Sequence, residues 1–122
     1  MNNQSFILII GVLSIMLDIF LTILSIALVK SKIRPNQFVG YRTRLSLSSD
    51  EAWTWCNKTM ALVFLAVSPY MTIASISLTI LSLIYNLSYW IVVGLFLLPT
   101  ALTLVTAVCI EIIGRRKFDI KK

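Results

Sequence analysis

Two carboxylic side chains lie within apolar stretches of this chain, and they are its best candidates for chemistry away from water. Asp18 sits near the middle of the stretch 6–29, and Glu111 lies close to the end of another. A charged carboxylate at the centre of a bilayer costs at least about 2.5–3.5 kcal/mol. Asp18 can therefore be a proton- or ligand-sensitive centre, or one partner of an interhelical hydrogen bond. For Glu111 we expect an ion pair with a basic residue such as Arg42 or Arg115, and we predict Arg42 as that partner, held by Glu111 where the loop folds back on the helices.

Small and hydroxyl-bearing residues recur at spacings of three and four, the spacing of one helical face. At the depth of Asp18 we place Thr72 and Ser75 in a second apolar stretch, and Thr100 and Thr103 in a third. In lipid such faces turn toward one another, because small residues permit close packing and hydroxyls find partners across the contact. We therefore expect a polar seam between the helices. Its predicted members are Gly11, Ser14, Asp18, Thr22 and Ser25; Ser68, Thr72, Ser75, Thr79, Ser82 and Asn86; and Thr100, Thr103, Ala107 and Glu111.

The common metal and acid–base sites find few candidates in this composition. The chain has no histidine, and its two cysteines, Cys56 and Cys109, lie inside or beside apolar stretches. A Cys/His metal site, a disulfide framework and an imidazole general base are therefore not predicted. Because we find no nucleophile–base pair either, we predict a protein that is not an enzyme and needs no cofactor.

The elements that must position these residues are three apolar stretches, 6–29, 59–84 and 88–113. Each exceeds the roughly 20 residues with which a helix crosses the hydrocarbon core of a bilayer. The first is too long for a signal peptide, and residues 1–4 lack the basic start of one. Only 13% of the residues are charged, against roughly 25% in soluble domains. We predict an all-α integral membrane protein with three transmembrane helices in a single membrane domain, residues 1–122.

A long polar loop, residues 30–49, separates the first two stretches and contains a proline and a glycine. Ser48 and Glu51 follow at the spacing of a capping box. A helix should therefore begin near residue 50 and run directly into the second stretch. Its first turns, with Trp53, are expected in the headgroup zone, where tryptophan is favoured.

All eleven basic residues fall in two places, residues 30–58 and 115–122. With three spans these places share one side of the membrane, and the positive-inside rule makes that side the cytoplasm. We therefore predict the N-terminus and the turn at 86–88 outside, and the C-terminus inside. Contact with anionic lipid headgroups explains the basic charge. Nucleic acid is not a predicted partner, because no soluble domain presents a basic surface.

The loop also carries the most specific motif of the chain. Gly40 permits a backbone turn before Tyr41, and Arg42 offers a bidentate fork to a carboxylate or a lipid phosphate. Trp53 and Asn57 lie one helical turn apart on a shared face, over which we expect the loop to fold. The motif can be a folding device, a working site, or both. It reads Asn36-Gln37-Phe38-Val39-Gly40-Tyr41-Arg42-Thr43, then Asp50-Glu51-Ala52-Trp53, then Asn57.

This motif, in its place between the first and second spans, resembles the signature of the SdpI/YfhL family of small bacterial membrane proteins. The resemblance implies a protein of the bacterial cytoplasmic membrane that confers immunity against a secreted antimicrobial peptide or protein toxin. Membrane lipids and that toxin would be its partners. Two alternatives remain open: a small proton-coupled transporter, suggested by Asp18, and an accessory subunit of a membrane complex. The candidate functional residues carried over are Asn36, Gly40, Tyr41, Arg42, Thr43, Trp53 and Asn57.

Overall fold

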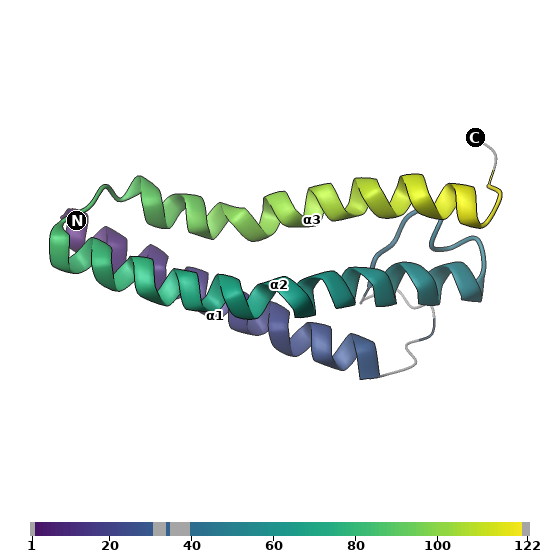
Figure 1. Cartoon of the computed structure of the whole chain (residues 1–122), viewed down its shortest axis with the longest axis horizontal. Helices are drawn as coiled ribbons and strands as arrows, with labels where there is room; N and C mark the ends of the chain where they lie inside the picture. The colour runs from purple at the N-terminus through teal and green to yellow at the C-terminus, as the bar shows by residue number, and fades with distance from the viewer. Residues whose placement is uncertain (1, 31–33, 35–39, 121–122) are drawn as a thin grey trace.

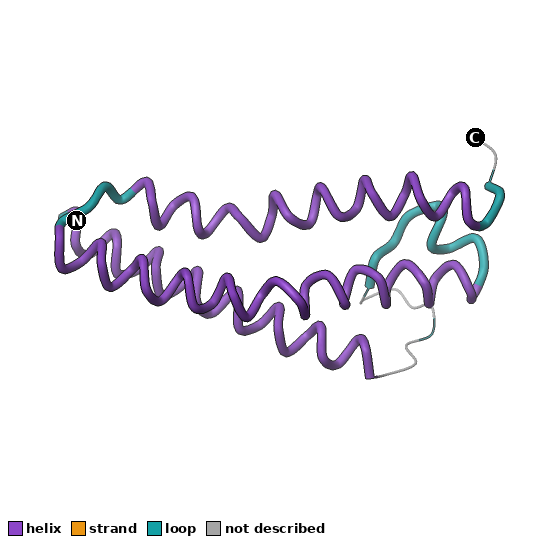
Figure 2. Tube along the Cα trace, in the orientation of Figure 1, coloured by secondary structure: helices purple, strands orange, loops and turns teal. Residues whose placement is uncertain are grey.

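Three long helices make up most of the molecule (Figure 1). The computed structural model describes residues 2–30, 34 and 40–120. Helix α1 spans Asn3–Lys30, α2 spans Asp50–Tyr85 and α3 spans Trp90–Lys117. Each is long and apolar enough to cross a membrane, as predicted, and the described connections between them are loops and turns (Figure 2).

Helix α2 begins where the sequence predicts, but its cap is one residue later than the expected capping box. The hydroxyl of Ser49 accepts a hydrogen bond from the backbone N–H of Ala52 at 3.0 Å, which satisfies one free donor of the first turn. The hydroxyl of Ser48 instead donates to the Leu45 carbonyl at 2.6 Å. At 36 residues, α2 is about 54 Å long, well beyond a hydrocarbon core of about 30 Å. Part of α2 must therefore extend beyond the hydrocarbon core of the bilayer.

The N-terminus and the α2–α3 turn lie at one end of the bundle, and the C-terminus and residues 40–49 lie at the other (Figure 1). At the first end Asn86 adopts a left-handed conformation, with φ 51°, and ends α2. The side chain of Gln4 donates to that of Asn86 at 3.3 Å. The rings of Phe6 and Tyr89 meet edge to face, 5.5 Å between centroids. All three helices are joined here, and α1 and α3 separate toward the opposite end (Figure 1).

Helices α1 and α2 are joined by the polar seam that the sequence predicts. Ser75 donates a hydrogen bond to Oδ2 of Asp18 at 2.7 Å, and the hydroxyls of Thr22 and Ser68 lie 2.7 Å apart. Gly11 lies so close to Thr79 that a β-carbon at position 11 would overlap the threonine side chain. Small residues thus bring the two backbones together, and polar pairs form across the contact.

The third part of the predicted seam is wrong. Thr100 and Thr103 are exposed, and Thr103 donates to the carbonyl of Pro99 in its own helix at 2.8 Å. A hydroxyl satisfied within its own helix needs no partner on another one. The face that α3 buries includes Pro99 and Thr106 instead. In α2, Thr72 likewise donates to the Ser68 carbonyl, at 2.9 Å, and does not reach Asp18.

Candidate functional site

The described part of the long loop, residues 40–49, folds over the end of the bundle, and we call it the cap. It starts at Gly40, whose φ of +121° favours glycine. A β-carbon there would meet Oδ1 of Asn57 at 2.5 Å and the ring of Trp53 at 3.1 Å. Two independent constraints, backbone conformation and space, therefore require glycine at this position.

Asn57 fixes the cap to α2 through the backbone. Its Oδ1 accepts from the Tyr41 N–H at 2.6 Å, and its Nδ2 donates to the Trp53 carbonyl one turn earlier at 2.9 Å. Trp53 is fully buried, at 1% exposed. The prediction that the loop folds over the shared face of Trp53 and Asn57 is confirmed.

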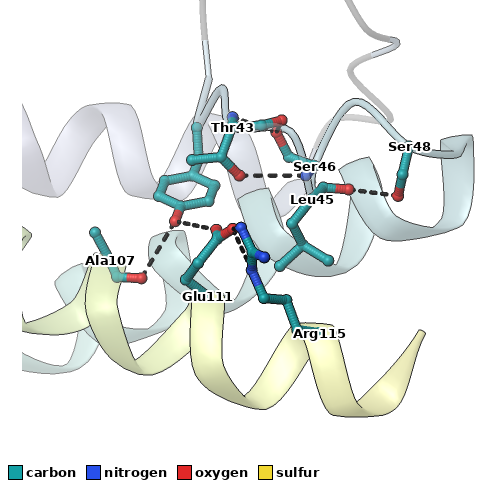
Figure 3. Close-up of polar contacts among 8 residues, drawn as sticks. Thr43, Leu45, Ser46, Ser48, Ala107, Glu111 and Arg115 are labelled. Carbon is teal, nitrogen blue, oxygen red and sulfur yellow. Dashed lines mark hydrogen bonds and ion pairs between the residues drawn. The ribbon is translucent and has the colours of Figure 1, made fainter. Parts of the chain in front are cut away.

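Tyr41 extends this attachment to α3, where Figure 3 labels Ala107 and Glu111. Its phenol has two acceptors in reach, the Ala107 carbonyl and Oε2 of Glu111, each at 3.2 Å. The pKa of the Tyr41 phenol is raised to about 12, mainly by burial and in part by the neighbouring Glu111 carboxylate, while a hydrogen bond with Thr43 opposes the rise. Tyr41 therefore acts as a neutral hydrogen-bond donor between the loop and α3.

Glu111 is paired, but with Arg115 and not with Arg42. Arg115 lies one turn along α3 and contacts Oε1 of Glu111 at 2.9 Å through its terminal nitrogen and 3.0 Å through Nε. With Tyr41 on Oε2, the carboxylate already has a partner on each oxygen. The Arg42 side chain is exposed, and among the described residues it makes no ion pair or hydrogen bond. The predicted pairing of Arg42 with Glu111 is therefore wrong: the local pair at i, i+4 forms instead, because it needs no loop to be ordered first.

Thr43 and Ser46 build the turn at the centre of the cap (Figure 3). The Thr43 N–H donates to Oγ of Ser46 at 2.8 Å, and that hydroxyl donates to the Thr43 carbonyl at 3.0 Å. The Ser46 N–H donates in turn to Oγ1 of Thr43 at 3.3 Å. This reciprocal arrangement satisfies the backbone of a short turn without any regular secondary structure.

Residues that the sequence reasoning did not single out complete the cap. Leu45, 1% exposed, packs with Cys56 of α2 and Ile110 of α3. A β-carbon at Gly114 would overlap Leu45 and lie 2.8 Å from the ring of Trp55. The available signal was a glycine inside the last turns of an apolar helix, which often marks a close approach.

The two carboxylates thus belong to separate places. Glu111 is part of the contact between the cap and α3, whereas Asp18 is 1% exposed between α1 and α2. Oδ1 of Asp18 has no hydrogen-bond partner in the described structure, and neither do the buried hydroxyls of Ser14, Thr79 and Ser82. All four of these buried polar atoms belong to residues of α1 and α2.

The described residues offer no group of three or more His, Cys, Asp or Glu side chains that could hold a metal ion. Cys56 is buried, Cys109 is exposed, and both are free. Of the motif residues, Asn36 lies outside the described residues. The structure brings Gly40, Tyr41, Trp53 and Asn57 into one set of contacts. Thr43 shapes the turn beside them, and Arg42 is exposed and makes no hydrogen bond or ion pair with another described residue. This arrangement anchors the cap to α2 and α3.

Comparison with known proteins reports on the same region. The model of the SdpI/YfhL protein family matches residues 32–110, more than half of the chain. The match runs through the cap, all of α2 and most of α3. Comparison with curated proteins and with solved structures gives no match.

Proposed function

Because the chain belongs to the SdpI/YfhL protein family, we propose that it is a membrane immunity protein. It protects a bacterium against a secreted antimicrobial peptide or protein toxin by binding the toxin, or blocking its action, within the cytoplasmic membrane. The main support for the proposal is that the family match includes the cap, and that hydrogen bonds hold the cap in a defined conformation. The Tyr41 N–H is bonded to Asn57 of α2, and the Tyr41 phenol reaches α3.

The same features support a binding role and no catalytic one. The hydrogen-bonded side chains of the cap hold it in place. Among the described candidate functional residues, only Arg42 presents an unpaired charge at the surface of the cap. A guanidinium on a fixed loop recognises a carboxylate or a phosphate. We place the cap on the cytoplasmic side, because all eleven basic residues lie in the loop, the start of α2 and the C-terminal tail.

The function is tested by expressing the protein in a sensitive bacterium. The cells are challenged with any secreted peptide or protein toxin whose gene is found beside this one, and with an unrelated pore-forming peptide as the control. Survival against the first peptide alone is the expected result. Equal sensitivity of expressing and empty cells, with the protein present in the membrane, would contradict the proposal.

Orientation is tested by labelling with a membrane-impermeant thiol reagent in intact cells. Arg44→Cys in the cap and Ser88→Cys in the opposite turn are suitable, because both positions are exposed. Wild-type Cys56 and Cys109 are first replaced by alanine. We expect labelling at position 88 and none at 44 until the cells are opened, and the reverse pattern would invert the topology.

A second candidate, a small proton-coupled transporter, is favoured by one observation. Asp18 is buried in the middle of α1 with Oδ1 unpartnered among the described residues, and intramembrane acids often carry protons. Asp18→Asn separates the two functions. It leaves immunity unchanged and abolishes any proton-driven uptake or efflux measured in proteoliposomes.

A further inference from the structure

A cavity of about 390 Å³ lies below the cap, within the size range of roughly 300–1,000 Å³ typical of ligand sites. It is bounded by the second half of α1, the first half of α2, one residue of α3 and the start of the cap. Its walls are mainly apolar. They include Leu21, Leu24, Leu28, Met60, Phe64 and Thr103.

The cavity follows from the way in which the cap is attached. Tyr41 and Leu45 tie the cap to α2 and α3, while α1 and α3 separate toward this end (Figure 1). Thr103, which borders the cavity, is exposed. The apolar walls belong to helices that are long and apolar enough to cross the membrane. Hydrocarbon is therefore the medium at their level, and an unfilled apolar gap forfeits dispersion contacts.

The uncharged polar side chains along the cavity are already hydrogen-bonded. Ser25 donates to the Leu21 carbonyl at 2.6 Å and Thr103 to the Pro99 carbonyl at 2.8 Å. Tyr41 and Asn57 are used in anchoring the cap. A peptide backbone inserted here would leave its N–H and C=O groups without partners, at a cost of several kcal/mol each in an apolar medium. An alkyl chain has no such groups.

One charged group, Arg42, stands among the described residues that line the cavity. It belongs to the cap, its side chain is exposed, and no described carboxylate pairs with it. A guanidinium fork matches the geometry of a phosphate. A basic cap placed above an apolar cavity has the amphiphilic order of an anionic lipid, with its charge at one end and hydrocarbon below.

We propose that this cavity binds one acyl chain of an anionic phospholipid, whose phosphate is held by Arg42. The site does not depend on the proposed immunity function, since lipid binding can be measured without any toxin. The lipid would fill the space between α1 and α3 beneath the cap and would link them there.

The test is native mass spectrometry of the detergent-purified protein titrated with phosphatidylglycerol or phosphatidylcholine. We expect one phosphatidylglycerol to be retained in preference to phosphatidylcholine. Arg42→Gln should weaken its apparent affinity about fivefold, the usual effect of one basic residue near a lipid surface. Thr103→Phe, which fills the cavity from an exposed position, should abolish the retained lipid.

Two matched variants control these effects. Arg44→Gln removes a cap charge that does not line the cavity, and Thr100→Phe adds a ring on α3 away from it. Neither should change retention. Equal loss in Arg44→Gln and Arg42→Gln, or unchanged binding in Thr103→Phe, overturns the proposal. So does competition by glycerol phosphate as effective as that by the whole lipid.

A second measurement covers a cavity variant that fails to accumulate. Wild-type protein in phosphatidylglycerol nanodiscs is irradiated with a phosphatidylglycerol that carries a diazirine in its acyl chain. Cross-links concentrated on Leu24, Met60 and Phe64 support the site. Cross-links spread evenly over the outer faces of the helices reject the proposed site. Protection of those three residues by a bound peptide or by a second copy of the chain also rejects it.

Discussion

The molecule solves the problem of burying polar groups in two different ways, at the α1–α2 seam and at the cap. At the seam, the main interaction is close packing at Gly11. Several buried oxygens there, including Oδ1 of Asp18, have no described partner. At the cap, the main interactions are hydrogen bonds, because Tyr41, Thr43 and Ser46 all have their polar groups paired. Two long apolar helices can tolerate some unpaired oxygens because shape holds them together. A loop without regular structure has no such support, so its shape depends on paired polar groups.

This contrast predicts that the largest loss of stability comes from the start of the cap. Gly40→Ala places a β-carbon 2.5 Å from Oδ1 of Asn57 at a φ of +121°. It should cost about 3 kcal/mol of unfolding free energy, measured by denaturant titration in detergent. Gly94→Ala is the control, because a β-carbon there meets nothing within 4 Å. A loss at position 94 as large as at position 40 would show that neither result reports on the cap.

The seam should respond next, through packing. Gly11→Ala drives a β-carbon into Thr79 and should cost about 2 kcal/mol. Thr79→Ala in the same chain removes the obstructing atoms and should restore most of that stability. The double-mutant cycle then gives a large coupling energy between the two positions. Additive effects would mean that the close approach of the helices is not what holds the seam.

The link from the cap to α3 should have a smaller and pH-dependent effect. Tyr41→Phe removes the hydrogen bond to Ala107 or Glu111 and should cost about 1 kcal/mol near pH 7. The pKa of Tyr41 is raised from 10 to about 12 by folding. Its contribution is therefore complete below pH 10 and is lost as the pH rises toward 12. Thermal stability of the wild type should fall over this interval, and that of Tyr41→Phe should fall less; parallel curves would remove Tyr41 as the cause.

The smallest effect is expected from the hydrogen bond inside the seam. Ser75→Ala removes the donor to Asp18 at 2.7 Å and should cost about 0.6 kcal/mol, the average for such bonds between membrane helices. Ser77→Ala, at an exposed position of the same helix, is the matched control. If Ser75→Ala proves costlier than Gly11→Ala, hydrogen bonding and not packing dominates the seam, and the contrast with the cap disappears.

The parts of the molecule that follow from local pattern could be predicted from sequence. The lengths of the apolar stretches predict the three helices, and residue spacing places Asp18 and Ser75 on facing sides. The shared face of Trp53 and Asn57 correctly predicts where the loop folds. These features depend on the period of a helix and on the bilayer thickness, both of which a single chain reveals.

The predictions that were wrong depend on which of several nearby groups a side chain contacts in the folded protein. Glu111 could pair with Arg42 or Arg115, and only the folded cap shows that Tyr41 occupies one of its oxygens. Thr103 carries the same hydroxyl as Thr22 but satisfies it within its own helix. Gly114 is important because Leu45 and Trp55 approach it closely. The local sequence does not predict which side chains approach this glycine.

The attachment of the cap has a consequence for biosynthesis. The cap connects α1 to α2 along the chain, but Leu45 is buried against Ile110, and Gly114 leaves the space that it occupies. The cap is therefore synthesised some 65 residues before its last partner, at the usual pace of about 5–20 residues per second. Until α3 emerges and inserts, Tyr41 and Leu45 lack their contacts with Ala107, Glu111 and Ile110. The insertion of the last helix is thus the event that completes a loop made several seconds earlier.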